Sequence, residues 1–228
     1  MIELIGLDGD DTLWHSENHF AEAQATFTRV MAPFLDDDAD VMARQYATER
    51  RNLRVFGYGA KGFTLSMIET AIEVTAGRVS TAAITQLLEL GKSLLEHPVD
   101  LLDGVDEALA ALADDHRLVL VTKGDLFHQE QKVAQSGLAD RFERVEIVSE
   151  KDEATYQRIV DAAGVPADRF LMVGNSVRSD VLPVLAIGGQ AVHVPYALTW
   201  SHEVVDDADG FPVLAGLAEL PAWLAAQP

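Results

Sequence analysis

The sequence contains no cysteine, which excludes disulfides, thiolate metal ligands and cysteine nucleophiles. It is also poor in basic residues, with 17 Lys and Arg against 37 Asp and Glu, for a formal net charge of −20 at pH 7. Nucleic-acid grooves and polybasic membrane anchors both depend on Lys and Arg. Neither a nucleic-acid partner nor a membrane partner is therefore expected.

Long apolar runs and a basic leader are also lacking. No run approaches the roughly 18 apolar residues of a membrane-spanning helix. The first residues, Met1 to Ile5, contain no basic segment of the kind that begins a secretory signal. Together with the lack of cysteine, these absences predict a cytoplasmic enzyme or binding protein.

What is present is the composition of a soluble globular protein: 228 residues, 48% hydrophobic and 24% charged. After Pro98 the pattern alternates between strands and helices that end in glycine. The predicted strands cover residues 117–122, 144–148, 170–173 and 190–194, and the predicted helices cover 126–136, 152–163 and a segment that ends at Ile187. Such alternation predicts an α/β fold, a Rossmann-like, mostly parallel sheet with helices on both faces.

A helical insertion follows the first predicted strand, which covers residues 2–7. Between residues 16 and 96 apolar side chains recur at helical spacing. Helices are expected over 39–55, 63–75 and 80–95, with N-cap candidates at Asp36 to Asp38 and at Ser80. An insertion of this length needs structure of its own, and it starts where an α/β sheet places its active site. We expect an α/β catalytic core of residues 1–14 and 98–228 and an all-helical cap of residues 15–97.

An acidic loop follows the first strand, with Asp8, Asp10 and Asp11 within four residues and Thr12 directly after them. Carboxylates this close repel one another, and a bound cation would offset the repulsion. Hard oxygen ligands favour Mg²⁺. The alternative is a solvated turn in which Thr12 is a cap. The other loops of the sheet bear on this choice.

The later predicted strands also end in polar residues, namely Thr122-Lys123-Gly124 after the second, Lys151 after the third, and Gly174-Asn175, then Asp180, after the fourth. A hydroxyl, a glycine and free N–H groups at a helix N-terminus form an anion site. The carboxyl ends of parallel strands share one edge of a sheet, so these groups should lie together. Carboxylates, a metal and positive groups around an anion suit phosphoryl transfer.

The chain resembles the haloacid dehalogenase superfamily, in the branch with a helical cap after the first motif. The segment Asp8-Gly9-Asp10-Asp11-Thr12 is similar to its first motif, Asp-x-Asp-x-Thr. Thr122 matches the second motif, Lys151 the third, and the segment from Gly174-Asn175 to Asp180 the acidic fourth. Order and spacing agree over nearly the whole chain, and four ordered motifs are far more specific than one.

The resemblance implies a hydrolase that acts on a small phosphomonoester. Asp8 would be the nucleophile and form an aspartyl-phosphate. Asp10 would protonate the leaving oxygen and then take a proton from water. Thr122 and Lys151 would hold the phosphoryl group, beside the anion-binding loop that contains Lys123 and Gly124.

The resemblance also implies a Mg²⁺ cofactor. Its ligands would be the Asp8 carboxylate, the Asp10 backbone carbonyl and a group from the fourth motif, either Asn175 or Asp180. Relatives often have Asp where Asn175 stands, and an amide oxygen binds Mg²⁺ without contributing charge. Relatives often have Gly where Asp11 stands. Because Asp tolerates left-handed backbone, the loop can keep its conformation, with the Asp11 side chain in solvent.

Three other functions use similar residues. Superfamily dehalogenases have an Asp nucleophile but lack the second Asp and need no metal, so Asp10 favours a phosphatase. A phosphomutase would pass the phosphate to a hydroxyl of a second substrate. A non-enzymatic phospho-receiver domain would be shorter, would have no cap and would carry its Asp on a later strand.

Two features of the predicted cap have less specific readings. Arg44, Arg51 and Arg54 share one helix face, and they either attract an anionic substrate or pair with acids of the cap itself. The glycine-rich segment 57–62 is a connection between cap helices, from which Tyr58 or Lys61 reads the substrate. The sequence does not name that substrate.

Overall fold

The computed structural model describes residues 1–35, 40–198, 200, 202–205 and 209–227. These residues form two compact units. The α/β unit combines Met1–Glu17 with Val99–Pro228, and the helical unit is Asn18–Pro98. Within the described residues, no helix has both the length and the apolar character needed to span a bilayer.

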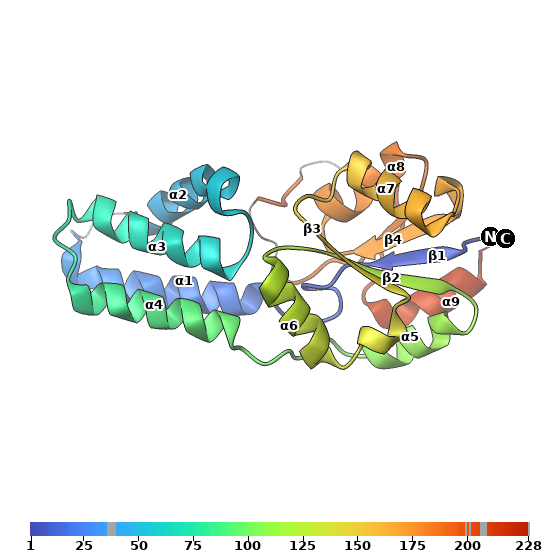
Figure 1. The fold of residues 1–228 in the computed structure, drawn as a ribbon, viewed down its shortest axis with the longest axis horizontal. Coiled ribbons are helices and arrows are strands. Elements are labelled where there is room, and N and C mark those ends of the chain that lie inside the picture. The colour runs from blue at the N-terminus through green and yellow to red at the C-terminus, as the bar shows by residue number, and fades with distance from the viewer. Residues whose placement is uncertain (36–39, 199, 201, 206–208, 228) are drawn as a thin grey trace. The chain divides into compact units, whose positions relative to one another are not determined.

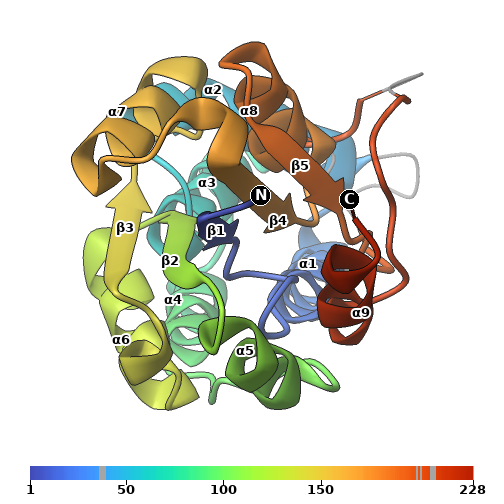
Figure 2. The same cartoon turned by 90° about the vertical axis from the view of Figure 1, so that its right-hand side faces the viewer.

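A five-stranded sheet forms the centre of the α/β unit. All its strands are parallel and run in the order β3-β2-β1-β4-β5 (Figure 2). The strands are β1 (Leu4–Leu7), β2 (Arg117–Lys123), β3 (Arg144–Val148), β4 (Phe170–Gly174) and β5 (Gln190–His193). At the end of β1, Leu7 lies in register with Leu120 of β2 and Val173 of β4. The strand order reverses beside β1, which is where parallel α/β sheets place their ligands.

Helices cover both faces of the sheet (Figure 1), as predicted. On one face lie α5 (Val105–Ala113), α6 (Leu126–Ser136) and α9 (Leu220–Ala225), and on the other α7 (Glu153–Ala163) and α8 (Leu182–Ala186). Successive side chains of a strand point to opposite faces of the sheet. In the buried strands both sets are apolar, so each face has a hydrophobic core. Ile5 and Leu118 belong to the first core, and Leu4 and Val119 to the second. The predicted α/β fold is therefore confirmed.

Two helices of this unit were not predicted, α5 and α9. In α5 the buried residues are Val105, Ala108, Leu109 and Leu112, which is the spacing of one helical face. The signal was therefore present in the sequence. In α9 it was weaker, because that helix has only six residues and buries Leu220 alone.

The single helix predicted after β4 is two elements. A π-helical turn covers Val177–Val181, and α8 begins only at Leu182. Pro183 lies in the first turn of α8, where the N–H that proline lacks is not needed. Ser176 caps the π turn by accepting a hydrogen bond from the Ser179 N–H at 3.0 Å. Such turns are frequent at functional sites, and this one contains Asp180.

The helical unit consists of α1 (Glu17–Met31), whose first residue belongs to the α/β unit, and of α2 (Val41–Phe56), α3 (Ala60–Val74) and α4 (Thr81–Leu95). Short 3₁₀ turns lie at Ala32–Phe34 here and at Ala139–Arg141, Ala167–Arg169 and Leu217–Glu219 in the α/β unit. Ser80 caps α4 as predicted, and Asp40 caps α2. The N-cap candidates Asp36 to Asp38 lie outside the described residues. The helix predicted from residue 63 begins at Ala60, where Gly59 has φ +102°.

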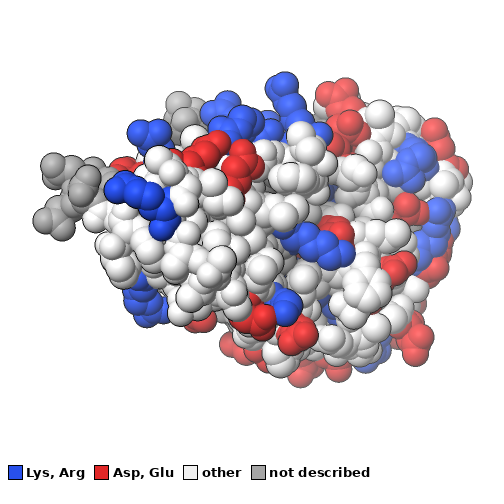
Figure 3. All heavy atoms as spheres, turned by 60° about the vertical axis from the view of Figure 1, so that its left-hand side comes forward, with Lys and Arg blue, Asp and Glu red and all other residues white. Residues whose placement is uncertain are grey.

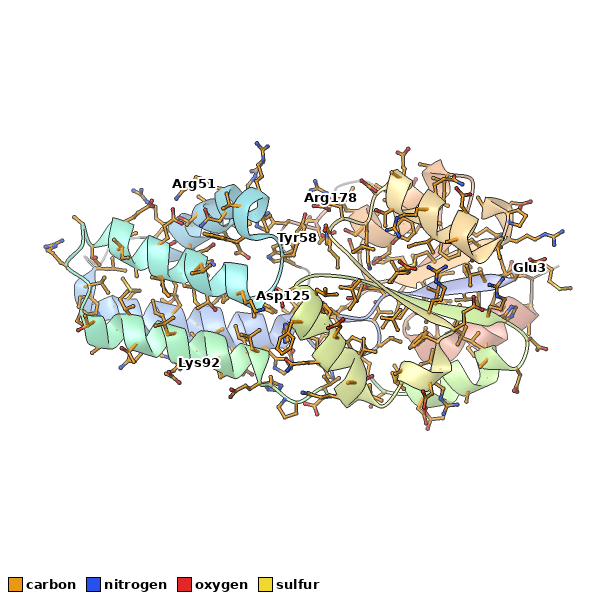
Figure 4. The ribbon with its side chains drawn as sticks, in the orientation of Figure 1. Glu3, Arg51, Tyr58, Lys92, Asp125 and Arg178 are labelled. Carbon is orange, nitrogen blue, oxygen red and sulfur yellow. The ribbon has the colours of Figure 1, made fainter. Side chains whose placement is uncertain are left out.

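On the face that Figure 3 shows, basic and acidic side chains are interspersed. Among the described residues, the predicted arginine cluster of α2 is divided between paired and unpaired residues. Arg51, which Figure 4 labels on α2, pairs with Glu69 at 2.7 Å and with Glu73 at 3.1 Å, both on α3. Within the described part of the chain, Arg44 and Arg54 form no ion pair. Of the three arginines, Arg51 therefore pairs with acids of its own unit, which is the second of the two predicted alternatives.

Candidate active site

The predicted site residues of the α/β unit lie at or shortly after the carboxyl ends of four neighbouring strands. Asp8 directly follows β1, and its backbone N–H donates to Val173 O of β4 at 2.9 Å, which continues the strand pairing by one residue. Thr122 is the last residue but one of β2, and Lys151 follows β3 by three residues. The common edge arises because all these strands run in parallel.

A buried lysine joins two carboxylates at the centre of this edge. Lys151 Nζ lies 2.5 Å from Asp8 Oδ1 and 2.7 Å from Asp180 Oδ1. The side chains of Lys151, Asp8 and Asp180 are 2%, 8% and 1% exposed. Three segments that are distant in the sequence thus converge on one ammonium group.

Burial and charge act against each other in this cluster. Burial raises the pKa of Asp8 to about 7, the repulsion of Asp180 adds to the rise, and Lys151 opposes it. Burial alone would lower the pKa of Lys151, but the charges of Asp180 and Asp8 raise it above its usual range. Lys151 is therefore held as a cation, and Asp8 lies near the point where it changes protonation state at neutral pH.

Asp180 is placed by the backbone before it. The Ser176 N–H donates to Asp180 Oδ2 at 3.0 Å, and Tyr156 Oη donates to Ser179 O at 2.9 Å. A Cβ added to Gly174 would lie 2.7 Å from Asp180 Cβ, so only glycine lets the carboxyl pack against the end of β4. The first residue of the fourth motif is therefore needed for space rather than for a left-handed turn.

The second carboxylate of the first motif, Asp10, is held by three donors. Trp14 Nε1 lies 2.6 Å and Lys132 Nζ 2.7 Å from Oδ1, and Gln129 Nε2 lies 2.9 Å from Oδ2. Burial alone would raise the pKa of Asp10, but the Lys132 charge and the three hydrogen bonds lower it below its usual range. In this arrangement Asp10 is anionic and fixed in position.

Asp11 does not face solvent, which corrects the expectation. Its backbone is left-handed as predicted, with φ +63°, but its side chain is buried. Oδ1 accepts hydrogen bonds from the backbone N–H groups of Ser16 at 2.8 Å and Glu17 at 3.0 Å. The carboxylate thus satisfies free donors at the start of α1, a role that needs the left-handed turn to bring it back along the chain.

Thr122 supplies a buried hydroxyl without a partner. The residue is 1% exposed, and no hydrogen-bond partner for Oγ1 lies within the described residues. A Cβ added to Gly9 would lie 3.3 Å from this oxygen and 2.7 Å from Trp14 Cζ2. Because an unsatisfied buried hydroxyl costs free energy, the atom indicates a place for a polar ligand. Thr12 is not a helix cap, since its Oγ1 donates to Asp8 Oδ2 at 3.3 Å.

Lys123 is engaged within the protein. Its Nζ lies 2.6 Å from Glu203 Oε1 and 3.1 Å from Ser179 Oγ. Lys123 and hydroxyl donors lower the pKa of Glu203 to about 2 although burial would raise it. Gly124 has φ +158°, and a Cβ there would lie 2.8 Å from Gln129 Nε2. Of the residues predicted to bind an anion, Thr122 therefore has a hydroxyl available for a ligand. The Lys123 ammonium group already binds Glu203 and Ser179.

The oxygens around Asp8 form a set that suits Mg²⁺. The Asp8 and Asp180 carboxylates both reach one ammonium group, so one cation can reach both. In the described part of the chain, no backbone N–H in a turn or loop donates to the carbonyl oxygen of Asp10. The described residues contain no cluster of three or more His, Cys, Asp or Glu suited to a metal. Two carboxylates are thus available, and the half-buried Asn175 follows β4 directly after Gly174.

Sequence reasoning missed several residues of this site, namely Gln129, Lys132, Tyr156 and Glu203. Gln129 and Lys132 are spaced i, i+3 on α6, so they share a helix face, and this signal could have been read. Glu203 lies 80 residues after Lys123 in a loop without regular structure. No local pattern marks it.

Comparisons with known proteins agree with the four motifs. The model of the haloacid dehalogenase-like hydrolase family matches residues 2–188. A comparison with curated proteins gives no match. The structure of a hydrolase of this family from Xanthomonas campestris is 50% identical, covers 99% of this chain and 91% of its own, and has a TM-score of 0.88. The resemblance drawn from the motifs is confirmed.

Two more distant structures share the fold. The 2-haloacid dehalogenase from Pseudomonas syringae is 24% identical over 99% of both chains, with a TM-score of 0.65. The hydrolase YfnB from Bacillus subtilis, whose structure contains magnesium, is 16% identical over 98% of both chains, with a TM-score of 0.69. At these identities the likeness concerns the fold alone.

Proposed function

This chain belongs to the haloacid dehalogenase-like hydrolases, and on that premise we propose that it is a Mg²⁺-dependent phosphatase of small phosphomonoesters. The observation that carries the proposal is the second carboxylate, Asp10, held by three donors two residues after Asp8. A phosphomonoester expels an alkoxide, which needs a proton from a general acid. A haloacid expels a halide, which does not.

Asp8 is the nucleophile in this proposal. One carboxylate oxygen attacks phosphorus, an Asp8–phosphorus bond forms, and the bond from phosphorus to the ester oxygen breaks. Lys151 stays charged beside Asp8 and stabilises the negative charge of the phosphoryl oxygens. The unpartnered hydroxyl of Thr122 donates a hydrogen bond to one of them.

Asp10 moves the protons. A phosphate dianion beside Asp10 raises its pKa and favours the protonated form, which gives its proton to the leaving oxygen. The resulting carboxylate is the form that the three donors stabilise. It then takes a proton from the water that attacks the aspartyl-phosphate, which releases phosphate and restores Asp8.

The metal is part of the same proposal. Mg²⁺ would bind to the Asp8 and Asp180 carboxylates, the Asp10 carbonyl oxygen and Asn175. Bound there, it would supply positive charge against the phosphoryl oxygens and reduce the repulsion between phosphate and the carboxylates. Lys151 alone supplies less charge than the two carboxylates and a phosphate dianion carry together.

We also propose that the helical insertion, predicted as residues 15–97, acts as the cap that selects the substrate, and that the protein works in the cytoplasm. The cap assignment is supported by the helical unit, which has a core of its own. The location is supported by the lack of cysteine and the lack of a spanning helix among the described residues.

The proposed function is tested by a phosphate-release screen over small phosphomonoesters with Mg²⁺, matched by a chloride-release screen over 2-haloacids. We expect phosphate release that EDTA abolishes and added Mg²⁺ restores, and no chloride release. Chloride release without phosphate release would mean a dehalogenase. Phosphate transfer to an added sugar phosphate, with little release to water, would mean a mutase.

A matched variant tests the metal ligands. Asn175→Asp should bind Mg²⁺ more tightly than the wild type, because a carboxylate adds a charge that an amide lacks. We expect the half-saturating Mg²⁺ concentration for phosphate release to fall by about 3- to 30-fold, as one added charge near the protein surface would give. Equal or tighter half-saturation in the wild type would contradict the ligand role of Asn175.

A further inference from the structure

The four acceptor positions of the Asp10 carboxylate are unequally used. A carboxylate has about two lone-pair positions on each oxygen. Oδ1 accepts from both Trp14 Nε1 and Lys132 Nζ, whereas Oδ2 accepts from Gln129 Nε2 alone. In this arrangement only Oδ2 has an acceptor position left for a proton. The three donors thus select which oxygen of Asp10 can exchange a proton with a ligand.

Two of these donors come from one face of α6. Asp125 begins the helix by accepting a hydrogen bond from the His128 N–H at 3.0 Å (Figure 4). Gln129 lies one turn later and Lys132 three residues after that, so both side chains project from the same side. Val133 of the same helix packs in the core of the α/β unit. The rotation of α6 is therefore determined by packing, and its polar face meets Asp10.

Gln129 also links Asp10 to the last residue of β2. Its Nε2 donates to Lys123 O at 3.2 Å in addition to Asp10. Gly124 makes room for this amide, because a Cβ there would lie 2.8 Å from Nε2. The amide therefore links the first motif to the end of β2, which contains Thr122.

We propose that Gln129 and Lys132 are positioning residues, which hold Asp10 so that Oδ2 delivers a proton to the leaving oxygen and later takes one from water. The proposal rests on the proposed phosphatase function. Neither residue touches the substrate; each acts through Asp10. Their role is to keep one carboxylate oxygen in one place through both halves of the reaction.

The geometry favours this role over a merely structural one. The Lys132 and Asp10 side chains are 12% and 27% exposed. Partly buried ion pairs are weak stabilisers, because desolvation offsets most of the attraction, and an apolar residue of similar size often serves as well. A methionine would therefore suffice at position 132 if only packing mattered.

The test is a leaving-group series of aryl phosphates, from p-nitrophenyl phosphate through phenyl phosphate to p-methoxyphenyl phosphate. The measured quantity is kcat/KM, which reports the step in which Asp8 is phosphorylated and the phenol leaves. The proteins are the full-length wild type, Lys132→Met, Lys132→Arg, Gln129→Met and, as reference, Asp10→Asn. A nitrophenolate leaves without a proton, whereas the other phenols benefit from a general acid.

We expect Lys132→Met and Gln129→Met to lose about 10- to 100-fold on phenyl and p-methoxyphenyl phosphate, and at most about threefold on p-nitrophenyl phosphate. The slope of log kcat/KM against the pKa of the phenol should approach that of Asp10→Asn. Lys132→Arg should regain part of the loss. Retained turnover of p-nitrophenyl phosphate shows that each variant is folded.

Two control variants match the substitutions: Lys92→Met on α4, an exposed lysine (Figure 4), and Gln135→Met, exposed on α6. Both should keep the wild-type slope. An equal loss on all three esters, or no loss on any, in both Lys132→Met and Gln129→Met would overturn the positioning role alone. A wild type without activity on any phosphomonoester would overturn the proposed function, and the positioning role with it.

Discussion

Replacing Asp8 with Asn is expected to abolish phosphate release, with a loss in kcat of about 10⁴-fold or more, as for other residues that form the covalent intermediate. Asparagine keeps the shape of the side chain but has no anionic oxygen to attack phosphorus. Burial already disfavours the charge of Asp8, whose pKa is raised to about 7. The variant should therefore fold, and its stability should change by no more than about 1 kcal/mol.

The measurement is steady-state phosphate release on the best substrate of the screen, together with the intact mass of acid-quenched protein. The wild type should show a phosphorylated species during turnover, and Asp8→Asn should show none. Gln135→Asn, on the exposed side of α6, is a control that should behave as the wild type. Turnover by Asp8→Asn within about tenfold of the wild type would remove Asp8 from the nucleophile role.

Replacing Lys151 with Met should have the largest effect on stability, a loss of about 3–5 kcal/mol at pH 8 without Mg²⁺, the usual cost of removing one partner from a buried pair. The variant leaves Asp8 and Asp180 buried and facing each other without a cation. It should also lose activity, since the proposed reaction uses the Lys151 charge to stabilise the phosphoryl oxygens. Lys92→Met removes an exposed pair and should change stability by less than about 0.5 kcal/mol.

The loss should depend on pH with a definite sign. The pKa of Asp8 is already raised to about 7, and it rises further without Lys151. Between about pH 4 and this raised pKa, the folded state binds more protons than the unfolded state. Stability that comes from a raised pKa is present at low pH and is lost as the pH increases. Lys151→Met should thus be closer to the wild type at pH 5 than at pH 8. Added Mg²⁺ should restore part of the loss, because in the proposed function it would bind to the folded site and not to the unfolded chain.

Urea unfolding followed by tryptophan fluorescence measures the stability of the α/β unit, which contains the site. All three tryptophans, Trp14, Trp200 and Trp223, lie in the α/β unit that contains the site. Equal stability of Lys151→Met and wild type at pH 8, or a deficit that grows as the pH falls, would contradict the account of the buried cluster.

Much of the fold was readable from local patterns. The helix at Leu126–Ser136 and the strand at Arg144–Val148 agree with their predicted bounds, because glycine caps and β-branched runs mark their ends. The helix after β4 was less accurate, since the change from a π turn to α8 depends on how Asp180 is packed under Gly174. Short α9 was missed because six residues carry little periodic signal.

Within the site, residues at strand ends were predictable and their partners were not. Asp8 and Lys151 follow strands and Thr122 is the last residue but one of β2, so parallel pairing alone brings them to one edge. Two of the three donors to Asp10, Gln129 and Lys132, come from 119 and 122 residues later in the chain, and their approach depends on the rotation of α6. The Asp11 side chain was expected in solvent, and this prediction was wrong. Its hydrogen bond with the Ser16 N–H forms only when the loop folds and brings the start of α1 next to the carboxylate.

The basic residues are few, and three of the lysines form ion pairs within the candidate active site. The sequence by itself determined the α/β class, the order of the four motifs and the lack of a basic surface. Only the tertiary structure decided how the few lysines are used: Lys151 between two carboxylates, Lys132 on Asp10 and Lys123 on Glu203. Hydrophobic periodicity and caps act over a few residues, so they can be read along the chain. Ion pairs between distant loops depend on strand order and helix rotation, which only packing of the whole unit determines.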